Sequence, residues 1–278
     1  MIKTVDFFGH QVTRMILGDN PFHGHSYIQE VYTHNDMVDY YTADKCVKAL
    51  FEAEENGMNA FMALASPFTL RVIHQYKNEG GKMHIMFQSY PPIDLELNIR
   101  EMMAYNPIAI YHQGTTFDDM WEKGQFDLIK KRLAFIRAAG VKVGIGTHIP
   151  EAVLQCEQEN WDIDFYMTCL YNSRKTQRGR QSSFITGEKS NQLIFYPDDR
   201  FEMFEAIKKV QKPCIVFKIF AGGQGFLGKN AAEISIAAEN MIKETYENIK
   251  PIDITCVGVF QRDKNQIKEN AYIVKKIL

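Results

Sequence analysis

Short apolar runs rich in β-branched and aromatic residues recur along the whole chain, and each is followed by a loop and a segment with apolar residues at helical spacing. Strands that are apolar on both faces and joined by helices are parallel, and eight such units close into a barrel. The pattern therefore predicts an α/β protein, a single (β/α)8 TIM barrel domain over residues 1–278. The predicted strands are Arg14–Leu17, Asn59–Leu64, Met83–Phe87, Pro107–Tyr111, Val141–Ile145, Ile163–Cys169, Cys214–Phe220 and Ile252–Val259.

Two further patterns complete the predicted architecture. Lys3–Phe8 and Gln11–Met15 flank a turn at Gly9, which predicts that residues 1–15 form an N-terminal β-hairpin closing the bottom of the barrel. Thr42 is a suitable cap for a helix whose apolar spacing continues to Gly57.

Composition narrows the class of protein. A net charge of -2 over 278 residues gives no general attraction for nucleic acid. We find no apolar stretch long enough to cross a membrane and no signal peptide. The five cysteines include no Cys-x-x-Cys pair, so we expect reduced thiols, mostly in the core, and a cytoplasmic protein. The oligomeric state does not follow from the sequence.

In a barrel of this kind the chemistry lies at the carboxyl ends of the strands. Polar residues follow several of the predicted strands, and we expect their side chains to converge on one pocket. They are Asp19, Asn20, His23 and His25 after strand one, Gln88 after strand three, His112 and Gln113 after strand four, Thr147 and His148 after strand five, and Lys218 near the end of strand seven.

We predict catalytic or ligand-contacting roles for Asp19, His112, His148 and Lys218, with the last three sharing one pocket. Protonated histidines there would bind an anion, whereas neutral ones would bind a divalent metal. The candidate metal ligands are His23, His25, His112 and His148. Other interpretations stay open, because His148 is also placed to cap the next helix, and His23 and His25 suit a polar surface loop.

Lys218 lies within an apolar run, where an unpaired ammonium is costly. It is a candidate contact for a substrate anion or a Schiff-base amine. The structural alternative is a buried ion pair with Asp19 or Asp164.

The connection after strand six, residues 173–198, is the longest in the chain and is a candidate lid. Arg174, Arg178 and Arg180 within it are candidate ligands for a phosphate or carboxylate. Gly222 and Gly223 could present backbone N–H groups to the same anion. The alternative is a solvated loop with an incidental run of charge.

Several segments resemble the aldo/keto reductase superfamily, and together they span nearly the entire chain. The resemblance implies a TIM barrel and NADP-dependent carbonyl reduction. The segments are Phe8–Gly18, Ala53–Asn59, Ala109–His112, Ala139–His148, Tyr171–Asn172, Phe217–Gly223 and Val257–Asn270.

The family's catalytic set is a tyrosine, a lysine, an aspartate and a histidine, and the resemblance places only His112 in that set. The segment Phe61–Pro67 carries neither the aspartate nor the tyrosine, and Gln88 stands where the lysine belongs. The resemblance therefore implies an oxidoreductase of atypical type, without the usual proton donor.

The resemblance also implies cofactor contacts. Gln266 and Asn270 match the adenosine side, and Gly222 and Gly223 match the loop near the pyrophosphate. On the nicotinamide side, Thr147 follows Gly146 where the family has a Ser-Asn pair, about Thr168 replaces a glutamine on strand six, and Tyr171 and Asn172 follow it. Gln88, Asn172 and the three arginines are the expected substrate or anion contacts. NADP and a divalent metal are both candidate cofactors, and the sequence requires neither.

Three functions follow from these residues. The leading one is an atypical, aldo/keto-reductase-like enzyme for a small molecule, nicotinamide-linked. The second is a metal- or lysine-assisted hydrolase or lyase for an anionic or sugar-like substrate. The third is a non-catalytic ligand sensor on the same scaffold. For all three functions we expect a small, anionic ligand. We expect neither nucleic acid nor a membrane as a partner.

Overall fold

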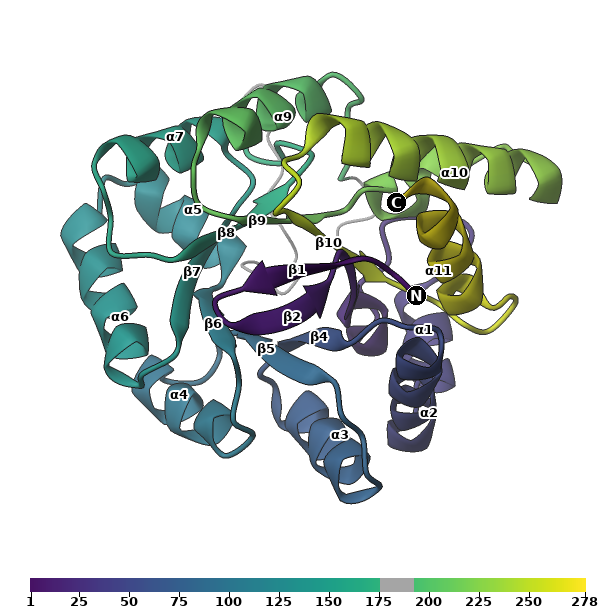
Figure 1. Ribbon diagram of the computed structural model, residues 1–278, viewed down its shortest axis with the longest axis horizontal. Helices are drawn as coiled ribbons and strands as arrows, with labels where there is room; N and C mark the ends of the chain where they lie inside the picture. The colour runs from purple at the N-terminus through teal and green to yellow at the C-terminus, as the bar shows by residue number, and fades with distance from the viewer. Residues whose placement is uncertain (176–192) are drawn as a thin grey trace.

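The structure, a computed structural model, describes residues 1–175 and 193–278. Eight parallel strands close into a barrel with the order β10-β3-β4-β5-β6-β7-β8-β9, which confirms the predicted (β/α)8 fold (Figure 1). The barrel strands are β3 (Met15–Gly18), β4 (Ala60–Leu64), β5 (His84–Gln88), β6 (Ala109–His112), β7 (Lys142–Thr147), β8 (Phe165–Cys169), β9 (Cys214–Phe217) and β10 (Ile254–Gly258).

The helices form a ring around the barrel, and α10 reaches outward past α11 (Figure 1). The predicted cap is present, because the Thr42 side chain accepts a hydrogen bond from the Lys45 N–H at the start of α2. None of the described helices combines the length and apolarity needed to cross a membrane. The α-helices are α1 (His34–Tyr40), α2 (Ala43–Glu55), α3 (Pro67–Asn78), α4 (Leu95–Met103), α5 (Gly114–Glu122), α6 (Phe126–Ala138), α7 (Pro150–Gln158), α9 (Asp199–Lys209), α10 (Ala231–Asn248) and α11 (Gln266–Ile277), with short 3-10 helices η1 (Asn20–His23) and η3 (Ala221–Phe226).

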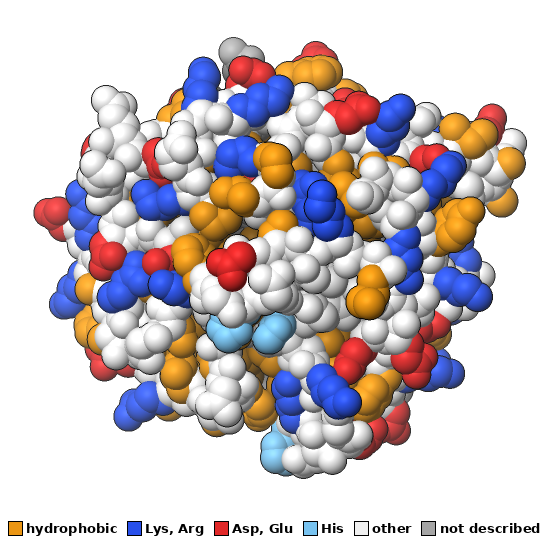
Figure 2. Space-filling model, viewed as in Figure 1, with side chains coloured by type: hydrophobic (Ala, Val, Ile, Leu, Met, Phe, Trp, Pro, Cys, Tyr) orange, Lys and Arg blue, Asp and Glu red, His pale blue; other side chains and the backbone are white. Residues whose placement is uncertain are grey.

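The predicted N-terminal hairpin is formed by β1 (Thr4–Phe7) and β2 (His10–Thr13), and it lies across the barrel in Figure 1. Phe7 and Val12 join the cluster of side chains that fills the barrel interior. The ring of Phe7 lies 5.4 Å from that of Phe165 on β8. The hairpin therefore closes the bottom of the barrel. On this face, side chains of both charges are interspersed (Figure 2).

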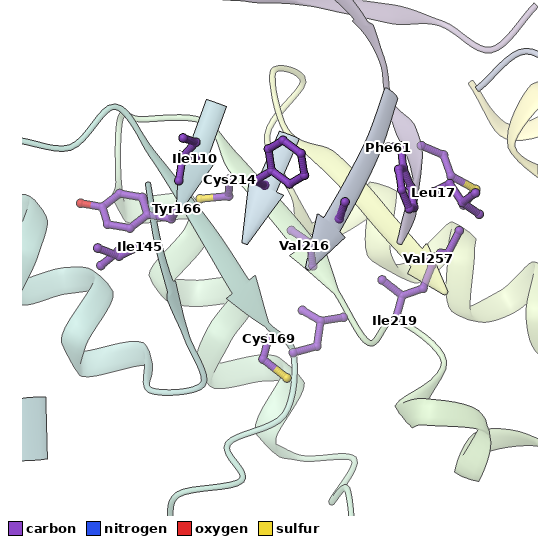
Figure 3. Close-up of a cluster of buried hydrophobic side chains, with 14 of the residues drawn as sticks. Leu17, Phe61, Ile110, Ile145, Tyr166, Cys169, Cys214, Val216, Ile219 and Val257 are labelled. Carbon is purple, nitrogen blue, oxygen red and sulfur yellow. The ribbon is translucent and has the colours of Figure 1, made fainter. Parts of the chain in front are cut away.

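Side chains alternate between the barrel interior and the layer beneath the helices, as the pleat of each strand requires. On β6, Ala109 and Tyr111 belong to the interior cluster, whereas Ile110 packs in the outer layer. Leu17 and Val216 are other members of the outer layer (Figure 3). This alternation decides which strand-end side chains reach the mouth of the barrel.

Candidate active site

A cavity of about 570 Å³ opens at the carboxyl ends of the barrel strands. At the mouth of the barrel it is lined by Asp19, Gln88, Tyr111 and Lys218. It continues past the loop after β9 and between α10 and α11. Its far end is lined by Gln266, Glu269 and Asn270 at the start of α11. A volume of this size is typical of small-molecule sites.

Polar groups at the mouth are held by the strand ends. Asp19 follows β3, and its Oδ2 accepts a hydrogen bond from the Leu64 N–H at 2.7 Å and lies 3.1 Å from His23 Nε2. The Tyr111 hydroxyl donates to the side-chain oxygen of Gln88. Burial raises the pKa of Tyr111 well above its ordinary value, so the phenol keeps its proton.

The four candidate metal ligands are not brought together. His23 and His25 are neighbours, with ring centroids 6.0 Å apart, but His112 packs against Phe117 and His148 against Phe217. Burial and the charge of His23 lower the pKa of His25 to about 4, so this imidazole is neutral at pH 7. Within residues 1–175 and 193–278, no group of three or more His, Cys, Asp or Glu side chains is arranged to hold a metal ion. The predicted histidine ligand set is therefore wrong.

Lys218 lines the cavity from a position just after β9, which ends at Phe217, three residues earlier than its apolar run predicted. Its φ of 61° is in the left-handed region, which disfavours side chains with a Cβ. The ammonium lies 4.5 Å from the ring centroid of Tyr27 and 4.9 Å from that of Phe195. These aromatic faces stabilise the cation.

The structure decides between the interpretations of Lys218. Asp164 pairs with Arg137 at 2.5 Å, and Asp19 pairs with His23 at 3.1 Å, so the predicted ion pair with either carboxylate is wrong. Burial opposes charging, but Tyr27 and Cys169 together raise the pKa of Lys218. A charged ammonium suits an anion contact and not a Schiff-base amine.

Gln224 in η3 ties together the loops that cover this part of the cavity. Its Nε2 donates to the carbonyl oxygens of Tyr27 at 3.0 Å and Leu193 at 2.6 Å. Its Oε1 accepts from the Phe195 N–H at 3.0 Å. One side chain therefore holds segments that follow β3, β8 and β9.

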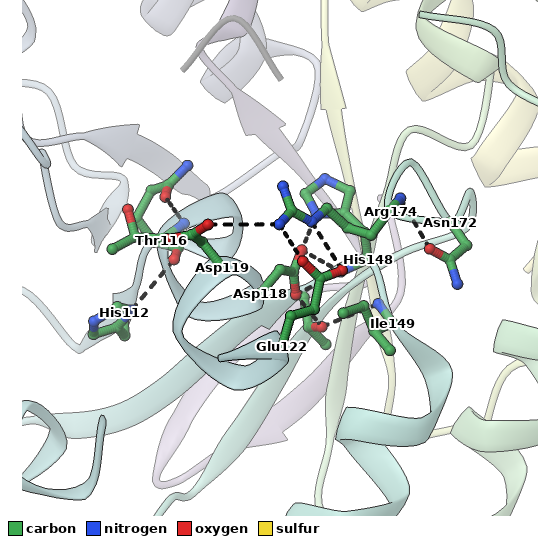
Figure 4. Close-up of polar contacts among 11 residues, drawn as sticks. His112, Thr116, Asp118, Asp119, Glu122, His148, Ile149, Asn172 and Arg174 are labelled. Carbon is green, nitrogen blue, oxygen red and sulfur yellow. Dashed lines mark hydrogen bonds and ion pairs between the residues drawn. The ribbon is translucent and has the colours of Figure 1, made fainter. Parts of the chain in front are cut away.

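His112 does not reach the cavity, which corrects the prediction that His112, His148 and Lys218 share one pocket. Its ring lies outside the barrel, 6.4 Å from that of Phe117 on α5, and Figure 4 shows it well apart from His148. Nε2 is buried and has no hydrogen-bond partner among the described residues. Burial and the charge of Arg132 lower the pKa of His112 to about 3, so the imidazole is neutral.

His148 instead pairs with a residue that the sequence did not single out. Asp118 on α5 is buried, and its Oδ2 lies 2.6 Å from His148 Nδ1 (Figure 4). The same carboxylate accepts hydrogen bonds from the Thr147 hydroxyl at 2.5 Å and from the His148 N–H at 3.1 Å. The helix-cap alternative is wrong, because Ile149 is the N-cap of α7.

Close contact between α5 and β7 brings Asp118 and His148 within hydrogen-bonding distance. A Cβ on Gly146 would lie 2.9 Å from the Cα of Gly114, and a Cβ on Gly114 would lie 3.2 Å from the backbone of Gly146. Only glycines allow the two backbones to approach this closely. The approach brings Asp118, one helical turn further along α5, to the end of β7.

His148 is also a neighbour of Cys169, the last residue of β8, because Thr147 pairs with Thr168 across β7 and β8. Burial opposes charging, but Cys169 and Asp118 raise the pKa of His148 to about 9. Burial likewise opposes ionisation of Cys169, yet the charges of His148 and Lys218 lower the pKa of the thiol. The only sequence signal for Cys169 was its place at a strand end, and Asp118 gave none.

The predicted cofactor contacts divide into two groups. Gly222, Gly223, Gln266 and Asn270 line the cavity. Thr147 does not, because its hydroxyl is turned outward to Asp118. Tyr171 is likewise absent from the lining, and its ring packs 5.1 Å from that of Phe195.

Two of the predicted anion contacts after β8, Asn172 and Arg174, are not at the mouth. Arg174 pairs with Glu122 on α5, and the side-chain oxygen of Asn172 accepts from the Arg174 N–H at 3.0 Å. Asn172 and Arg174 do not line the cavity. Arg178 and Arg180 lie outside the described residues.

No family model matches the sequence, and no curated protein matches it. Solved structures do resemble the fold. An aldo-keto reductase from Bacillus halodurans in its holo form has a TM-score of 0.60 at 11% identity, covering 99% of this chain and 91% of that chain. A mutant of Gox0644 in complex with NADPH has a TM-score of 0.57 at 12% identity, covering 100% and 90%.

A truncated 3-deoxy-D-arabino-heptulosonate 7-phosphate synthase from Thermotoga maritima is also similar, with a TM-score of 0.54 at 12% identity, covering 99% of this chain and 91% of that one. The predicted resemblance to aldo-keto reductases is confirmed for the fold. Because enzymes of different chemistry share the barrel, fold similarity does not select the reaction.

Proposed function

We propose that this chain is an enzyme that binds an adenine dinucleotide of the nicotinamide class along the cavity and acts on a small anionic molecule at the barrel mouth. The observation that carries the proposal is the continuity of the cavity, from Lys218 at the mouth to Gln266 and Asn270 on α11. A site of that form accommodates an extended ligand with two functional ends.

The far end of the cavity fits an adenosine. Ile234 and Ala238 on α10 supply an apolar wall, and the amide side chains of Gln266 and Asn270 supply donors and acceptors for a base. Lys229 and Lys264 also line this part and offer positive charge to phosphate groups.

The start of α11 is not free to bind phosphate through its backbone. The Gln261 side-chain oxygen accepts from the N–H groups of Gln266 at 2.7 Å and Ile267 at 3.2 Å. The Asn265 side chain accepts from the Lys268 N–H at 2.8 Å. Lysine side chains, and not helix N–H groups, would therefore contact the phosphates.

The residues at the mouth set the chemistry of the substrate end. A bound nicotinamide dinucleotide would supply or accept a hydride. The buried phenol of Tyr111 keeps its proton and is placed to donate a hydrogen bond to a substrate oxygen, in competition with Gln88. Lys218, held by the rings of Tyr27 and Phe195, offers a fixed positive charge to a carboxylate or phosphate on the substrate.

Fluorescence titration with NADPH and NADH tests the proposal. We expect saturable binding of at least one of them at sub-millimolar concentration. Asn270→Ala should weaken binding about tenfold, equivalent to roughly one hydrogen bond at about 1.4 kcal/mol. Ala238→Trp, which fills the apolar wall, should abolish it.

Lys268→Ala is the matched control, because Lys268 is exposed on the same helix and does not line the cavity. Its affinity should equal that of the wild type. No saturable binding of either nucleotide to the wild-type protein would rule out the dinucleotide. Saturable binding with no turnover of any carbonyl or alcohol would favour a ligand sensor.

A further inference from the structure

A buried acid, imidazole and thiol form a continuous chain beside the cavity. Asp118 Oδ2 lies 2.6 Å from His148 Nδ1, and Thr147 pairs with Thr168 across β7 and β8, so the next residues, His148 and Cys169, are neighbours. The ring of His148 rests edge-on against Phe217, 5.6 Å between centroids, and Phe217 pairs with Cys169 across β8 and β9. Side chains from α5 and the ends of β7 and β8 therefore meet at one point.

The arrangement fixes the role of each group. Three hydrogen bonds, from the Thr147 hydroxyl and from the backbone and ring of His148, satisfy the Asp118 carboxylate and hold it in place. A carboxylate on Nδ1 selects the tautomer or charge state in which the other ring nitrogen faces the thiol.

The other buried cysteines show that this environment is particular to Cys169. Cys156 lies among helices, and burial raises the pKa of its thiol to about 12. Burial likewise raises the pKa of Cys214 and of Cys256. Cys169 is buried just as completely, but His148 and Lys218 place positive charge beside it. A thiol beside an imidazole that is oriented by a carboxylate is the arrangement that activates a nucleophile.

We propose that Cys169 is a nucleophile, activated by His148 and oriented through Asp118, that forms a reversible covalent adduct with a small aldehyde admitted from the cavity. The cavity reaches its immediate surroundings, since Met167, Phe217 and Lys218 all line it. Met167 lies two residues before Cys169 on the same strand (Figure 3 shows Cys169 at the strand end).

Formation of the adduct from the thiolate and the aldehyde requires no oxidant or reductant. The thiolate sulfur of Cys169 donates an electron pair to the carbonyl carbon, and the electrons of the C=O π bond move to the oxygen. The oxygen takes the proton that the imidazolium of His148 holds, which leaves a neutral imidazole and a thiohemiacetal. Lys218 on the cavity side stabilises the charge that develops on the oxygen.

The location of the sulfur selects the class of electrophile. Cys169 has no exposed surface, so a ligand must pass the side chain of Lys218 and the aromatic rings that surround it. A small uncharged molecule meets the lowest desolvation cost on that route. Addition to an aldehyde needs neither a leaving group nor a water molecule, whereas acyl transfer to a thiol expels a leaving group and needs water to hydrolyse the thioester.

Alkylation of the native protein with iodoacetamide at pH 7.5, without nucleotide and with each cysteine mapped by mass spectrometry, tests the proposal. We expect Cys169 to react at least about tenfold faster than Cys156 or Cys214, as a thiolate does relative to a buried thiol. Propanal should slow labelling of Cys169 in a saturable manner, and propan-1-ol should not. His148→Gln should reduce the rate at Cys169, and Cys156→Ser, the matched control, should not.

A direct readout is the 13C NMR signal of propanal labelled at the carbonyl carbon. We expect a protein-bound thiohemiacetal resonance that is absent from Cys169→Ser. If that variant does not fold, the labelling rates of the wild-type protein with and without propanal are sufficient to test the proposal. Labelling of Cys169 no faster than Cys156 would show a structural thiol, and labelling that propanal leaves unchanged would exclude the aldehyde. Either outcome would overturn the proposed role of Cys169, and neither would contradict the proposal that the cavity binds a dinucleotide.

Discussion

Asp118 on α5 and His148 after β7 are joined through a contact of 2.6 Å between Oδ2 and Nδ1, and both side chains are buried. The contact orients the imidazole, and Cys169 and Asp118 together raise the pKa of His148 to about 9 against the effect of burial. A buried pair of this kind loses much of its stability when one partner is removed, because the other is left without compensation.

Asp118→Asn should therefore lower the pKa of His148 from about 9, since burial is then opposed chiefly by Cys169. We also expect a loss of about 3 kcal/mol in the free energy of unfolding. An NMR titration of the His148 ring carbon and urea denaturation measure the two effects. Asp119→Asn is the matched control, because Asp119 pairs with Lys123 at the surface. An unchanged titration in Asp118→Asn would contradict the assignment.

Gly146→Ala should separate α5 from β7. The new Cβ would lie 2.7 Å from the ring of Tyr111 and 2.9 Å from the Cα of Gly114, so backbone must move. We expect the free energy of unfolding to fall by about 2 kcal/mol, as for other overpacked cores. Gly80→Ala, where a Cβ meets nothing within 4 Å but φ is +95°, should cost only about 1 kcal/mol in urea denaturation. Equal costs would show that the close approach is not required.

Stability should fall in mild acid because His112 is buried in its neutral form. Its folded pKa is about 3 and its ordinary value is 6.5, so between these values the unfolded chain binds more protons than the folded one. The free energy of unfolding therefore decreases as pH falls through this window, by about 1.4 kcal/mol per pH unit from this residue. His25, with a pKa of about 4, adds to the same trend.

His112→Leu removes that contribution, so urea denaturation between pH 6.5 and about 4 should show a slope shallower by about 1.4 kcal/mol per unit. Little stability should be lost at pH 7, because His112 Nε2 has no partner among the described residues and Nδ1 makes one long contact of 3.3 Å. His74→Gln, on an exposed helix position, serves as the control and should retain the wild-type slope. A wild-type slope in His112→Leu would contradict the neutral, buried state.

Lys218 is held with a φ of 61°, so substitutions there should separate backbone strain from charge. Lys218→Gly should be more stable than Lys218→Ala by about 1 kcal/mol, because glycine adopts positive φ without the steric cost of a Cβ. Thermal or urea denaturation of the two variants gives the comparison. Identical stabilities would mean that this backbone conformation is not enforced by the fold.

The fold could be predicted from the sequence because each strand, helix and turn is indicated by residues close together in the chain. Strands buried on both faces of a parallel sheet are apolar runs, and the helices between them carry their own caps, as at Thr42. The hairpin turn at Gly9, with a φ of 90°, was marked by its glycine. These features depend on a few neighbouring residues, so the residues alone identify them.

For the candidate site, the sequence predicted only the end of the barrel at which it lies and some of its lining residues. Strand ends are where a barrel places its chemistry, and Asp19, Gln88 and Lys218 do line the cavity. The side on which a strand-end residue projects, however, changes with every residue along the strand. Tyr111 faces the mouth, and His112, one position later, faces the helices. Strand boundaries read from sequence are not accurate enough to make that distinction.

The sequence by itself determined the strand and helix units, the hairpin and the rim on which polar residues gather. Tertiary structure alone decided that Asp118, His148 and Cys169 meet, because they come from α5, the loop after β7 and the end of β8. Their contact depends on how closely α5 approaches β7 at Gly114 and Gly146. Such an approach is a property of packed backbones, and no periodicity or spacing along the chain records it.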